Sequence, residues 1–523
     1  MAIHSTVSVR QIISRNPATG DILGSFDCAG PDEVRAAVTS ARAAQGAWAA
    51  TPIQRRIEIL RRFQRLLYDQ KKETAEIITR EMGKPLVESL TTEVIVVLDY
   101  ARFCAEHGYA CLRPQPVPHG NLAMKAKRGQ ILHEPYGVIG IVSPWNYPFS
   151  TPGTETLAAL LAGNAVVLKP SEFTPLCALK LQELLHQAGV PKDVFQIVLG
   201  EGDTGAALTA SEVDKIIFTG SVATGKRVSQ AAAARLVPVI LELGGKDPML
   251  VLDDMDIDVA SSGAVWGAFV NAGQACLSVE RCYVHRSLYD RFVKLCAEKT
   301  ARLRVGNGMD PETEVGPMIH ERQMRMVESH VDEARSAGAR VLVGGKRLPE
   351  LGPNFYTPTV ITDLDHSMRI MREETFGPVL PIMPFDDDDQ AVRLANDSEF
   401  GLAASVWTRN RARGEAIARR LEAGTVMVND VVSCFGISEA PHGGVKSSGL
   451  GRTHGFDALE EMTRVKYLDS DLLPGIPKVW WYGYGKVFSR QMDAFADFLF
   501  GRGLRRITGG LRSAGAYFRK GRI

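Results

Sequence analysis

The sequence lacks the paired cysteines that mark disulfide scaffolds and zinc sites. Its 523 residues include eight cysteines, none in a Cys-x-x-Cys pair or at zinc-ligand spacing. In a long chain this favours reduced thiols, no metal site and a cytoplasmic protein. No apolar run approaches the ~20 residues of a membrane span. The first residues, MAIHSTVSVRQII, also lack the apolar stretch of a signal peptide.

The chain has almost no net charge. Its 61 Lys and Arg nearly balance its 60 Asp and Glu, so the overall charge gives no reason to expect nucleic-acid binding. The distribution is less even, because residues 470–523 hold ten Lys and Arg but only three Asp. A basic excess at one end of a chain is a feature that a partner can bind.

Short apolar runs alternate with helical stretches in the middle of the chain. The runs lie at 137–142, 165–168, 195–199, 215–218 and 239–243. Strands separated by helices predict a parallel sheet with helices on its faces. A second α/β segment follows at 244–446, and a chain of this length needs more than one core. The predicted fold class is therefore α/β, with ligands at the carboxyl ends of the strands.

Two of the turns after these runs carry residues suited to a nucleotide. Gly220, Ser221 and Gly225 open a helix, where free N–H groups favour an anion such as a pyrophosphate. Lys169 and Glu172 end the neighbouring run and could both reach a ribose. A carboxylate there accepts from a free 2′-hydroxyl and repels a 2′-phosphate. Taken singly, these features also fit a packing turn and a solvated surface pair.

Three further residues are candidates for chemistry. Cys276 follows an apolar helix, Glu242 ends a strand in LELGGK, and Asn146 lies in the turn PWNYP. Taken singly, a lone cysteine is most often an inert core residue. The other two equally fit an exposed acid and a turn residue.

Taken together, these segments resemble the aldehyde dehydrogenase superfamily. The resemblance covers about residues 10–468, with the family's motifs in order and at the right spacing. The matching stretches are NPATGD (16–21), EMGKPL (81–86), SPWNYPF (143–149), VVLKPSEFTP (166–175), FTGSVATG (218–225), LELGGKDP (241–248), NAGQACLSVERCYV (271–284), EETFGPVLPI (373–382) and PHGGVKSSGLGR (441–452). One such motif is weak evidence, but the ordered set is specific.

The resemblance implies an NAD-dependent oxidation of an aldehyde to a carboxylic acid. Cys276 is then the nucleophile that forms a thioester. The Asn146 amide and the backbone N–H of Cys276 hold the developing oxyanion. Glu242 is the general base that activates water. Family members that pass the acyl group to coenzyme A tend to lack this base.

The resemblance also implies a nucleotide site. The expected cofactor-binding residues are Trp145, Lys169, Glu172, Gly220, Ser221, Gly225, Glu374 and Phe376. Glu172 favours NAD, and NADP stays the alternative because some members with this residue use both.

The implied architecture is a Rossmann-like NAD-binding domain, a second α/β catalytic domain and a small β bridging element. The expected bounds are 1–120 and 136–243 for the NAD-binding domain, 244–446 for the catalytic domain, and 121–135 with 447–470 for the bridging element. In the family this element pairs subunits, so a homodimer or homotetramer is expected.

The residues beside the candidate catalytic groups indicate the substrate. Leu277 follows Cys276 and Trp145 precedes Asn146. Ligand pockets are mostly apolar, so both residues suggest an apolar, medium- or long-chain aldehyde, although both equally fit the core.

Two other functions stay open. A semialdehyde dehydrogenase takes a carboxylate-bearing substrate and needs an Arg or Lys in its pocket. Arg281 is near Cys276 in sequence, but so is Glu280. An inactive binding or structural protein on the same fold would be expected to lose Cys276 or Glu242.

Residues 471–523 form a basic, aromatic tail. Its aromatic cluster is Trp480, Trp481, Tyr482 and Tyr484; Phe488, Met492, Phe495 and Leu499 then recur on one helix face. The charge comes from Arg502, Arg505, Arg506, Arg512, Arg519, Lys520 and Arg522. This composition fits a helix on an anionic membrane surface, and so predicts peripheral association with the inner face of a membrane. The alternative is packing on the enzyme itself or on a second subunit.

Overall fold

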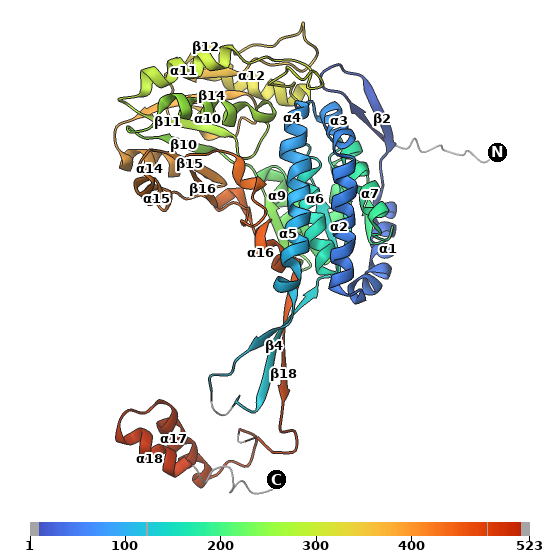
Figure 1. The fold of residues 1–523 in the computed structure, drawn as a ribbon, viewed down its shortest axis with the longest axis vertical. Helices are drawn as coiled ribbons and strands as arrows, with labels where there is room; N and C mark the ends of the chain where they lie inside the picture. The colour runs from blue at the N-terminus through green and yellow to red at the C-terminus, as the bar shows by residue number, and fades with distance from the viewer. Residues whose placement is uncertain (1–9, 122–123, 479, 514–523) are drawn as a thin grey trace, which may run out of the picture. The chain divides into compact units, whose positions relative to one another are not determined.

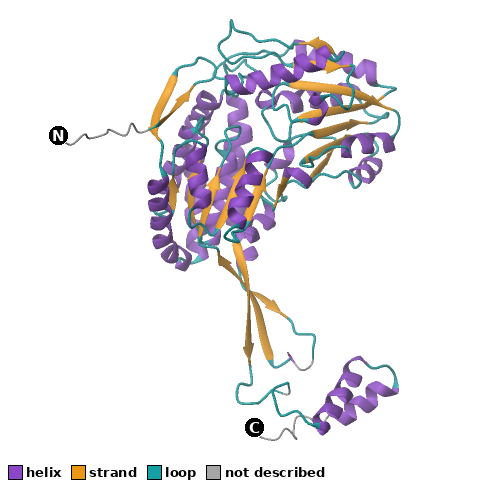
Figure 2. Ribbon diagram, turned by 180° about the vertical axis from the view of Figure 1, so that it is seen from behind, coloured by secondary structure: helices purple, strands orange, loops and turns teal. Residues whose placement is uncertain are grey.

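The computed structural model describes residues 10–121, 124–478 and 480–513 (Figure 1). The chain divides into two compact units: a main body of residues up to 113 and 133–465, and a small unit of residues 114–132 and from 466 onward. In the main body, helices flank two separate sheets (Figure 2). Within the described ranges, no helix has the length and apolar character needed to span a membrane.

The first sheet has six strands in the order β17-β9-β8-β5-β6-β7. The strands are β5 (Val138–Val142), β6 (Ala165–Lys169), β7 (Phe195–Ile197), β8 (Lys215–Thr219), β9 (Val239–Glu242) and β17 (Gly449–Leu450). All pair in parallel except β17, which lies antiparallel to β9. The chain builds outward from β5 through β6 and β7, and then returns to the other side of β5. Sheets of this kind bind ligands where the order reverses, here at the carboxyl ends of β5 and β8.

Helices cover both faces of this sheet. The crossover helices are α6 (Ser150–Ala162), α7 (Pro175–Ala188), α8 (Gly202–Ala210) and α9 (Val222–Ala233). Because parallel crossovers are right-handed, α6 and α7 lie on one face and α8 and α9 on the other. The N-terminal elements are β1 (Gln11–Arg15), β2 (Ile22–Asp27), α1 (Pro31–Ala50), α2 (Ile53–Asp69), α3 (Lys71–Met82), α4 (Leu86–Glu88), η1 (Ser89–Val94) and α5 (Ile95–Leu112). Helices α2 and α5 pack on α6, every residue of which is buried.

The second sheet has seven strands in the order β12-β13-β14-β11-β10-β15-β16. They are β10 (Asp247–Val251), β11 (Val279–His285), β12 (Arg340–Val343), β13 (Thr359–Thr362), β14 (Val379–Phe385), β15 (Ala403–Trp407) and β16 (Thr425–Val428). The helices are α10 (Ile257–Phe269), η3 (Val270–Gly273), α11 (Tyr289–Ala301), α12 (Glu321–Ser336), α13 (Arg369–Arg372), α14 (Asp388–Asn396), α15 (Arg411–Ala418), η4 (Ser433–Gly436) and η5 (Lys446–Ser448), while α16 (Gly455–Glu461) packs on α5 and α6. Each sheet has its own apolar core, so the predicted α/β class with two α/β domains is confirmed.

The small unit holds a three-stranded sheet and two helices. The sheet has the order β18-β4-β3, with β3 (Gln115–Val117), β4 (Lys127–Pro135) and β18 (Thr463–Asp471). The helices are α17 (Lys486–Phe500) and α18 (Leu504–Ser513). Residues 514–523, which complete the predicted basic tail, lie outside the described residues.

The bridging element predicted at 447–470 begins later in the structure. Residues 447–462 belong to the main body, because β17 pairs with β9 and α16 packs on α5 and α6. At the other end, β3 starts before the predicted bound at residue 121. Only the strand-like part of each segment therefore joins the small sheet.

A buried lysine connects the N-terminal helices to the first sheet. Helix α3 ends at Gly83, whose φ of +92° suits glycine, and Lys84 then turns inward. Its ammonium donates to Glu93 Oε1 at 2.7 Å and to the carbonyl of Asn146 at 2.9 Å. Glu93 Oε2 in turn accepts the backbone N–H groups of Phe149 (3.1 Å) and Ser150 (2.7 Å) at the start of α6. One ion pair thus fixes the turn after β5.

Replacing this lysine should be strongly destabilising. The side chains of Lys84 and Glu93 are both fully buried, so Lys84→Met leaves an unpaired carboxylate inside the protein. We expect a loss of about 3–5 kcal/mol in the free energy of unfolding, measured by urea denaturation. Lys294→Met is the control, because its pair with Glu298 is exposed and should contribute less than about 1 kcal/mol. A Lys84→Met protein as stable as this control would contradict the stabilising role assigned to the ion pair between Lys84 and Glu93.

Candidate active site

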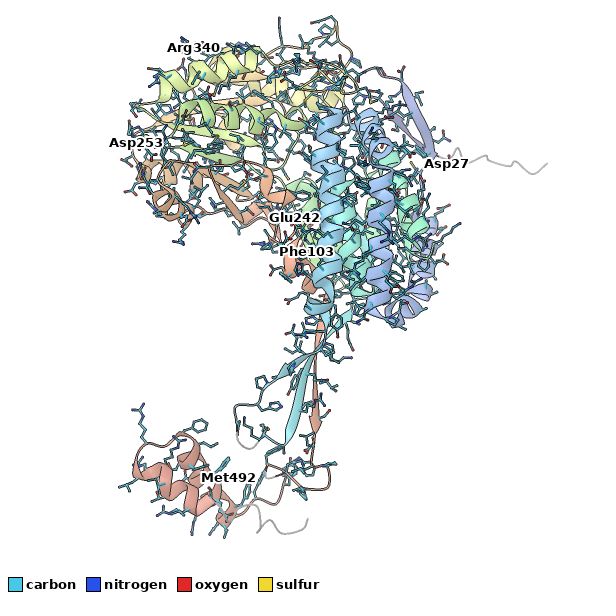
Figure 3. The ribbon with its side chains drawn as sticks, viewed as in Figure 1. Asp27, Phe103, Glu242, Asp253, Arg340 and Met492 are labelled. Atoms are coloured by element: carbon cyan, nitrogen blue, oxygen red, sulfur yellow. The ribbon has the colours of Figure 1, made fainter. Side chains whose placement is uncertain are left out.

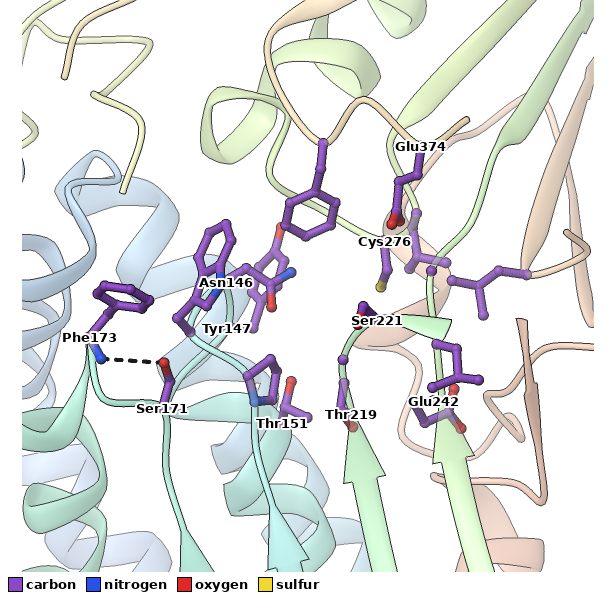
Figure 4. A pocket seen from close by; sticks show the side chains of 18 of the residues that line it. Asn146, Tyr147, Thr151, Ser171, Phe173, Thr219, Ser221, Glu242, Cys276 and Glu374 are labelled. Carbon is purple, nitrogen blue, oxygen red and sulfur yellow. Dashed lines mark hydrogen bonds between the residues drawn. The ribbon is translucent and has the colours of Figure 1, made fainter. Parts of the chain in front are cut away.

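Three separate segments of the chain bring the predicted catalytic residues to one cavity. Asn146 lies between β5 and α6, Cys276 lies between η3 and β11, and Glu242 ends β9. Glu242 lies inside the main body (Figure 3). The cavity has a volume of about 630 Å³, and all three residues line it (Figure 4). The predicted grouping of these three residues is therefore present in the structure.

The turn before Cys276 has an unusual backbone. Asn271 and Ala272 both have a φ of +54°, in the left-handed region, which costs roughly 1–3 kcal/mol at each such residue. The buried Glu88 carboxylate opposes this cost by accepting the backbone N–H of Asn271 at 2.9 Å. Burial raises the pKa of Glu88 to about 7, while the Asn271 N–H and Lys84 act to lower it. The nucleophile loop is thus held in place by a residue from the N-terminal helices.

The Asn146 loop and the nucleophile loop are bonded to each other. The side chain of Asn271 donates to the carbonyl of Asn146 at 2.9 Å. The side chain of Asn146 donates to the carbonyl of Gln274 at 3.1 Å. Asn146 and Cys276 therefore hold their relative positions without a ligand.

The electrostatics of the cavity favour the protonated forms of Cys276 and Glu242. Burial raises the pKa of the Cys276 thiol well above its usual range, and the Asp247, Glu242 and Glu374 carboxyls raise it further. Burial, followed by Glu155, also raises the pKa of Glu242 well above its usual range. The Cys276 thiol is therefore neutral at pH 7 in the free protein, and burial favours the neutral form of Glu242.

The groups in direct contact with Glu242 are polar and uncharged, while Arg452 acts on it only through its charge, which lowers the pKa of Glu242. Thr453 Oγ1 donates to Glu242 Oε1 at 3.3 Å, and His442 Nε2 lies 3.8 Å from Glu242 Oε2. Burial, with Arg452 nearby, lowers the pKa of His442 to about 4, so its imidazole is neutral at pH 7. Glu242 therefore has polar neighbours that do not neutralise a negative charge on it.

Six of the eight predicted cofactor residues line the same cavity. They are Trp145, Glu172, Gly220, Ser221, Glu374 and Phe376. The rings of Trp145 and Phe376 meet edge to face, with 5.4 Å between their centroids. Ser221 caps the N-terminus of α9, where unpaired N–H groups favour phosphate.

The other two predicted cofactor residues, Lys169 and Gly225, are not among the residues that line the cavity. The ammonium of Lys169 is 3.5 Å from Glu172 Oε2, and burial lowers the pKa of Lys169. Gly225 is on α9, where a Cβ atom would lie 2.5 Å from the Leu243 side chain. The glycine therefore serves the packing of α9 against β9.

The residues present fit a dinucleotide. The cavity extends from Ser171 and Phe173 at one end to Cys276 and Glu374 at the other (Figure 4). Each end also offers a carboxylate that can accept from a ribose, Glu172 or Glu374, with the N-terminus of α9 along the same wall.

Several lining residues lie outside the recognised motifs. They include His320, Arg322, Gln323, Met326, Leu402, Phe435, Thr453 and His454. The segment 320–326 opens α12, which reaches the cavity from a distant part of the sequence, so no local pattern could have identified it.

Arg281 and Glu280, which were candidates for a cationic pocket, do not line the cavity. The Arg281 guanidinium is fully buried and donates to the carbonyls of Lys246, Leu394 and Ala395. Among the described lining residues, Arg322 is the one Arg or Lys. It lies two residues along the chain from His320, whose ring is 4.5 Å from that of Phe173.

Known proteins are similar to this chain in sequence and in fold. The model of the aldehyde dehydrogenase family matches residues 4–468. A 4,4'-diapolycopene aldehyde oxidase of Methylomonas sp. is 38% identical over 495 residues, covering 94% of this chain and 91% of that protein. A Mycolicibacterium smegmatis protein provisionally named succinate-semialdehyde dehydrogenase (NADP+) is 40% identical over 446 residues, covering 85% of this chain and 86% of its own length.

A solved structure agrees with these sequence matches. The NAD+ complex of an aldehyde dehydrogenase from Bacillus cereus is 36% identical, with a TM-score of 0.85 over 88% of this chain and 94% of that one. Identity at this level over nearly the whole length of both chains extends beyond the fold to the family. The chain therefore belongs to the aldehyde dehydrogenase family.

Proposed function

We propose that this enzyme oxidises an apolar, medium- or long-chain aldehyde to its carboxylic acid, with NAD as the hydride acceptor. The observation that carries the proposal is the lining near Cys276, where Leu277, Leu402 and Phe435 form an apolar group. Among the described lining residues the one Arg or Lys is Arg322, two residues along the chain from His320, whose ring lies 4.5 Å from that of Phe173. A substrate carboxylate beside Leu277, Leu402 and Phe435 would face apolar side chains, and burying it unpaired is costly.

The catalytic groups would act in two stages. Cys276 loses its proton and attacks the aldehyde carbon, while the Asn146 amide and the Cys276 N–H stabilise the oxyanion. After the hydride leaves, the acyl group remains on sulfur as a thioester. Glu242 then takes a proton from water, which attacks the thioester and releases the acid and the Cys276 thiolate.

The cofactor would be held by residues along the cavity. Glu172 and Lys169 are assigned to the adenosine ribose, Gly220 and Ser221 to the pyrophosphate, and Glu374 and Phe376 to the nicotinamide ribose. When bound, NAD+ supplies the hydride acceptor and a positive charge, which favours the ionised forms of Cys276 and Glu242.

NAD is proposed ahead of NADP because of Glu172, whose carboxylate would repel a 2′-phosphate. The Bacillus cereus structure contains NAD+, which supports this choice. The Mycolicibacterium smegmatis relative is named for NADP+, so NADP stays the alternative.

The second candidate is a semialdehyde dehydrogenase, which the name of the same relative favours. The Methylomonas relative is instead named for an aldehyde of 4,4'-diapolycopene. The hypothesis of an inactive binding or structural protein has the least support, because Cys276 and Glu242 are both present in the cavity.

Kinetics with two aldehydes separates the first two candidates. We expect kcat/KM with NAD to be at least ~100-fold higher for dodecanal than for succinic semialdehyde, since each buried methylene contributes about 0.8 kcal/mol. Cys276→Ala should oxidise neither. A preference for succinic semialdehyde would contradict the proposal that the substrate is apolar. It would indicate that a cationic side chain of the enzyme contacts the substrate carboxylate.

We also propose that the tail attaches the enzyme to the inner face of a membrane in the cytoplasm. The eight cysteines are unpaired, which suits a reducing compartment. On α18, Leu504, Ile507 and Leu511 recur on one helix face and are 79%, 64% and 78% exposed, beside Arg505, Arg506 and Arg512. Exposed apolar side chains bordered by arginines fit an anionic lipid surface.

Helices α17 and α18 pack closely through glycine. A Cβ atom at Gly509 would lie 2.6 Å from the carbonyl of Ala494, and one at Gly510 would lie 2.9 Å from the Phe498 ring. The predicted apolar face of α17, which includes Phe488 and Met492, is half-buried. The residues of α18 are therefore better candidates for lipid contact than those of α17.

Vesicle flotation tests this attachment. The full chain should float with vesicles of phosphatidylcholine and phosphatidylglycerol, and binding should weaken as salt screens the arginines. A triple variant with Leu504, Ile507 and Leu511 changed to Ser should float much less, while Leu236→Ser, another exposed leucine, should float like the unchanged chain. No flotation of the unchanged chain would exclude membrane attachment and favour a contact between subunits.

The small sheet is proposed to join subunits into a homodimer or homotetramer. Strand β18 exposes Val465, Tyr467 and Leu468. Exposed apolar residues on an edge strand favour pairing with another chain.

A further inference from the structure

We propose that Glu280 is a positioning residue that anchors the loop of Glu374 and Phe376 and thereby sets the affinity for NAD. The inference deepens the proposed function, since it takes this loop as one wall of the nicotinamide site. Glu280 follows Cys276 by four residues, on β11. It does not line the cavity, so it would act through the loop.

The carboxylate of Glu280 is bonded to the backbone of this loop on both oxygens. Oε1 accepts the N–H of Phe376 at 2.8 Å and that of Thr375 at 3.1 Å, and Oε2 accepts the N–H of Thr375 at 2.8 Å. The ammonium of Lys246 donates to Oε2 at 2.5 Å and to Thr375 Oγ1 at 3.3 Å. Glu280 is 5% exposed and Lys246 1%. Bonds of this kind to a buried charge are among the stronger ones in proteins.

The loop needs such an anchor because its backbone is strained. Phe376 has a φ of +51° without being a glycine, a conformation that persists only where the surroundings enforce it. The Gln323 side chain adds bonds to the carbonyls of Thr375 and Phe376 at 3.2 and 3.1 Å. Glu280 and Gln323 together hold the peptide groups on either side of the strained residue.

The same anchor connects the loop to the catalytic side of the cavity. Glu374 Oε1 accepts the N–H of Gly245 at 3.0 Å, next to Lys246 on the chain. The loop also lies against the nucleophile turn, where a Cβ at Gly273 would be 2.2 Å from the carbonyl of Gly377. A small shift of the loop would therefore move Glu374 and Phe376 relative to Cys276.

Glu280→Gln is the direct test. The amide oxygen of the new Gln side chain can still accept a backbone N–H of the loop. Its NH₂ group cannot accept, and it would face another donor, either the Lys246 ammonium or the second backbone N–H, so hydrogen bonds to the loop are lost. We expect the Kd for NAD+, measured by calorimetry, to rise roughly 10- to 100-fold. Without NAD+, the alkylation rate of Cys276 by iodoacetamide, followed by peptide mass spectrometry, should change by no more than about twofold.

Asp254→Asn is the matched control. Its carboxylate also holds a loop of the second domain, accepting from Thr408 Oγ1 at 2.7 Å and from the backbone N–H of Asn410 at 3.1 Å. It does not line the cavity. The Asn variant should keep the unchanged Kd for NAD+, and equal weakening by both variants would overturn the specific role of Glu280.

A second variant covers the case in which Glu280→Gln does not fold. Glu280→Asp keeps a charge near Lys246 but shortens its reach toward the N–H of Phe376, so NAD+ binding should still weaken, by about fivefold or more. Unchanged affinity in either folded variant overturns the proposal. If the unchanged enzyme binds no NAD+, the proposed function fails together with the inference; if it binds and the variants bind equally well, only the inference fails.

Discussion

The buried ion pair between Lys84 and Glu93 is the contact on which the catalytic geometry depends. Lys84 holds the carbonyl of Asn146, and Glu93 holds the first N–H groups of α6. The Asn146 carbonyl also accepts from Asn271, whose own N–H is held by Glu88. Residues of the N-terminal helices thus fix two loops that reach the cavity from different domains. Buried charges are expensive unless they are fully bonded, so the arrangement favours one geometry over its alternatives.

The same physics favours the neutral form of the nucleophile in the free enzyme. Burial raises the pKa of the Cys276 thiol, and the carboxyls of Asp247, Glu242 and Glu374 raise it further. A cation in the cavity reverses this balance, and the proposed cofactor carries one. Reactivity of the thiol would then increase when the nucleotide binds, and the neutral thiol of the free enzyme would be less prone to side reactions.

The sequence predicted the features that depend on neighbouring residues, such as strands and motifs. It did not predict the contacts between segments that are far apart in the chain. The five parallel strands of the first sheet lie within two residues of their predicted positions, because buried strands between turns have a clear apolar signature. Cys276, Asn146 and Glu242 were found through ordered motifs that resemble a family. Residues of α12 such as Gln323 carry no local signal, because their role comes from packing.

Two other outcomes have the same cause. The bridging element was predicted too long, since the pairing of β17 with β9 joins strands about 200 residues apart in the sequence and such contacts are invisible to periodicity. Arg281 and Glu280 could not be located from the sequence. In the structure Arg281 donates hydrogen bonds to buried carbonyls, and Glu280 accepts hydrogen bonds from the loop near residue 375.

The most direct test of the central claim is to trap the acyl group on Cys276. Glu242→Gln should form the thioester but hydrolyse it slowly, because the general base contributes about 10²–10⁴-fold to such a step. After mixing this variant with dodecanal and NAD+ and quenching in acid, peptide mass spectrometry should find a dodecanoyl group on the peptide of Cys276, at roughly one per subunit. Turnover at the unchanged rate with no acyl group on Cys276 would contradict the account.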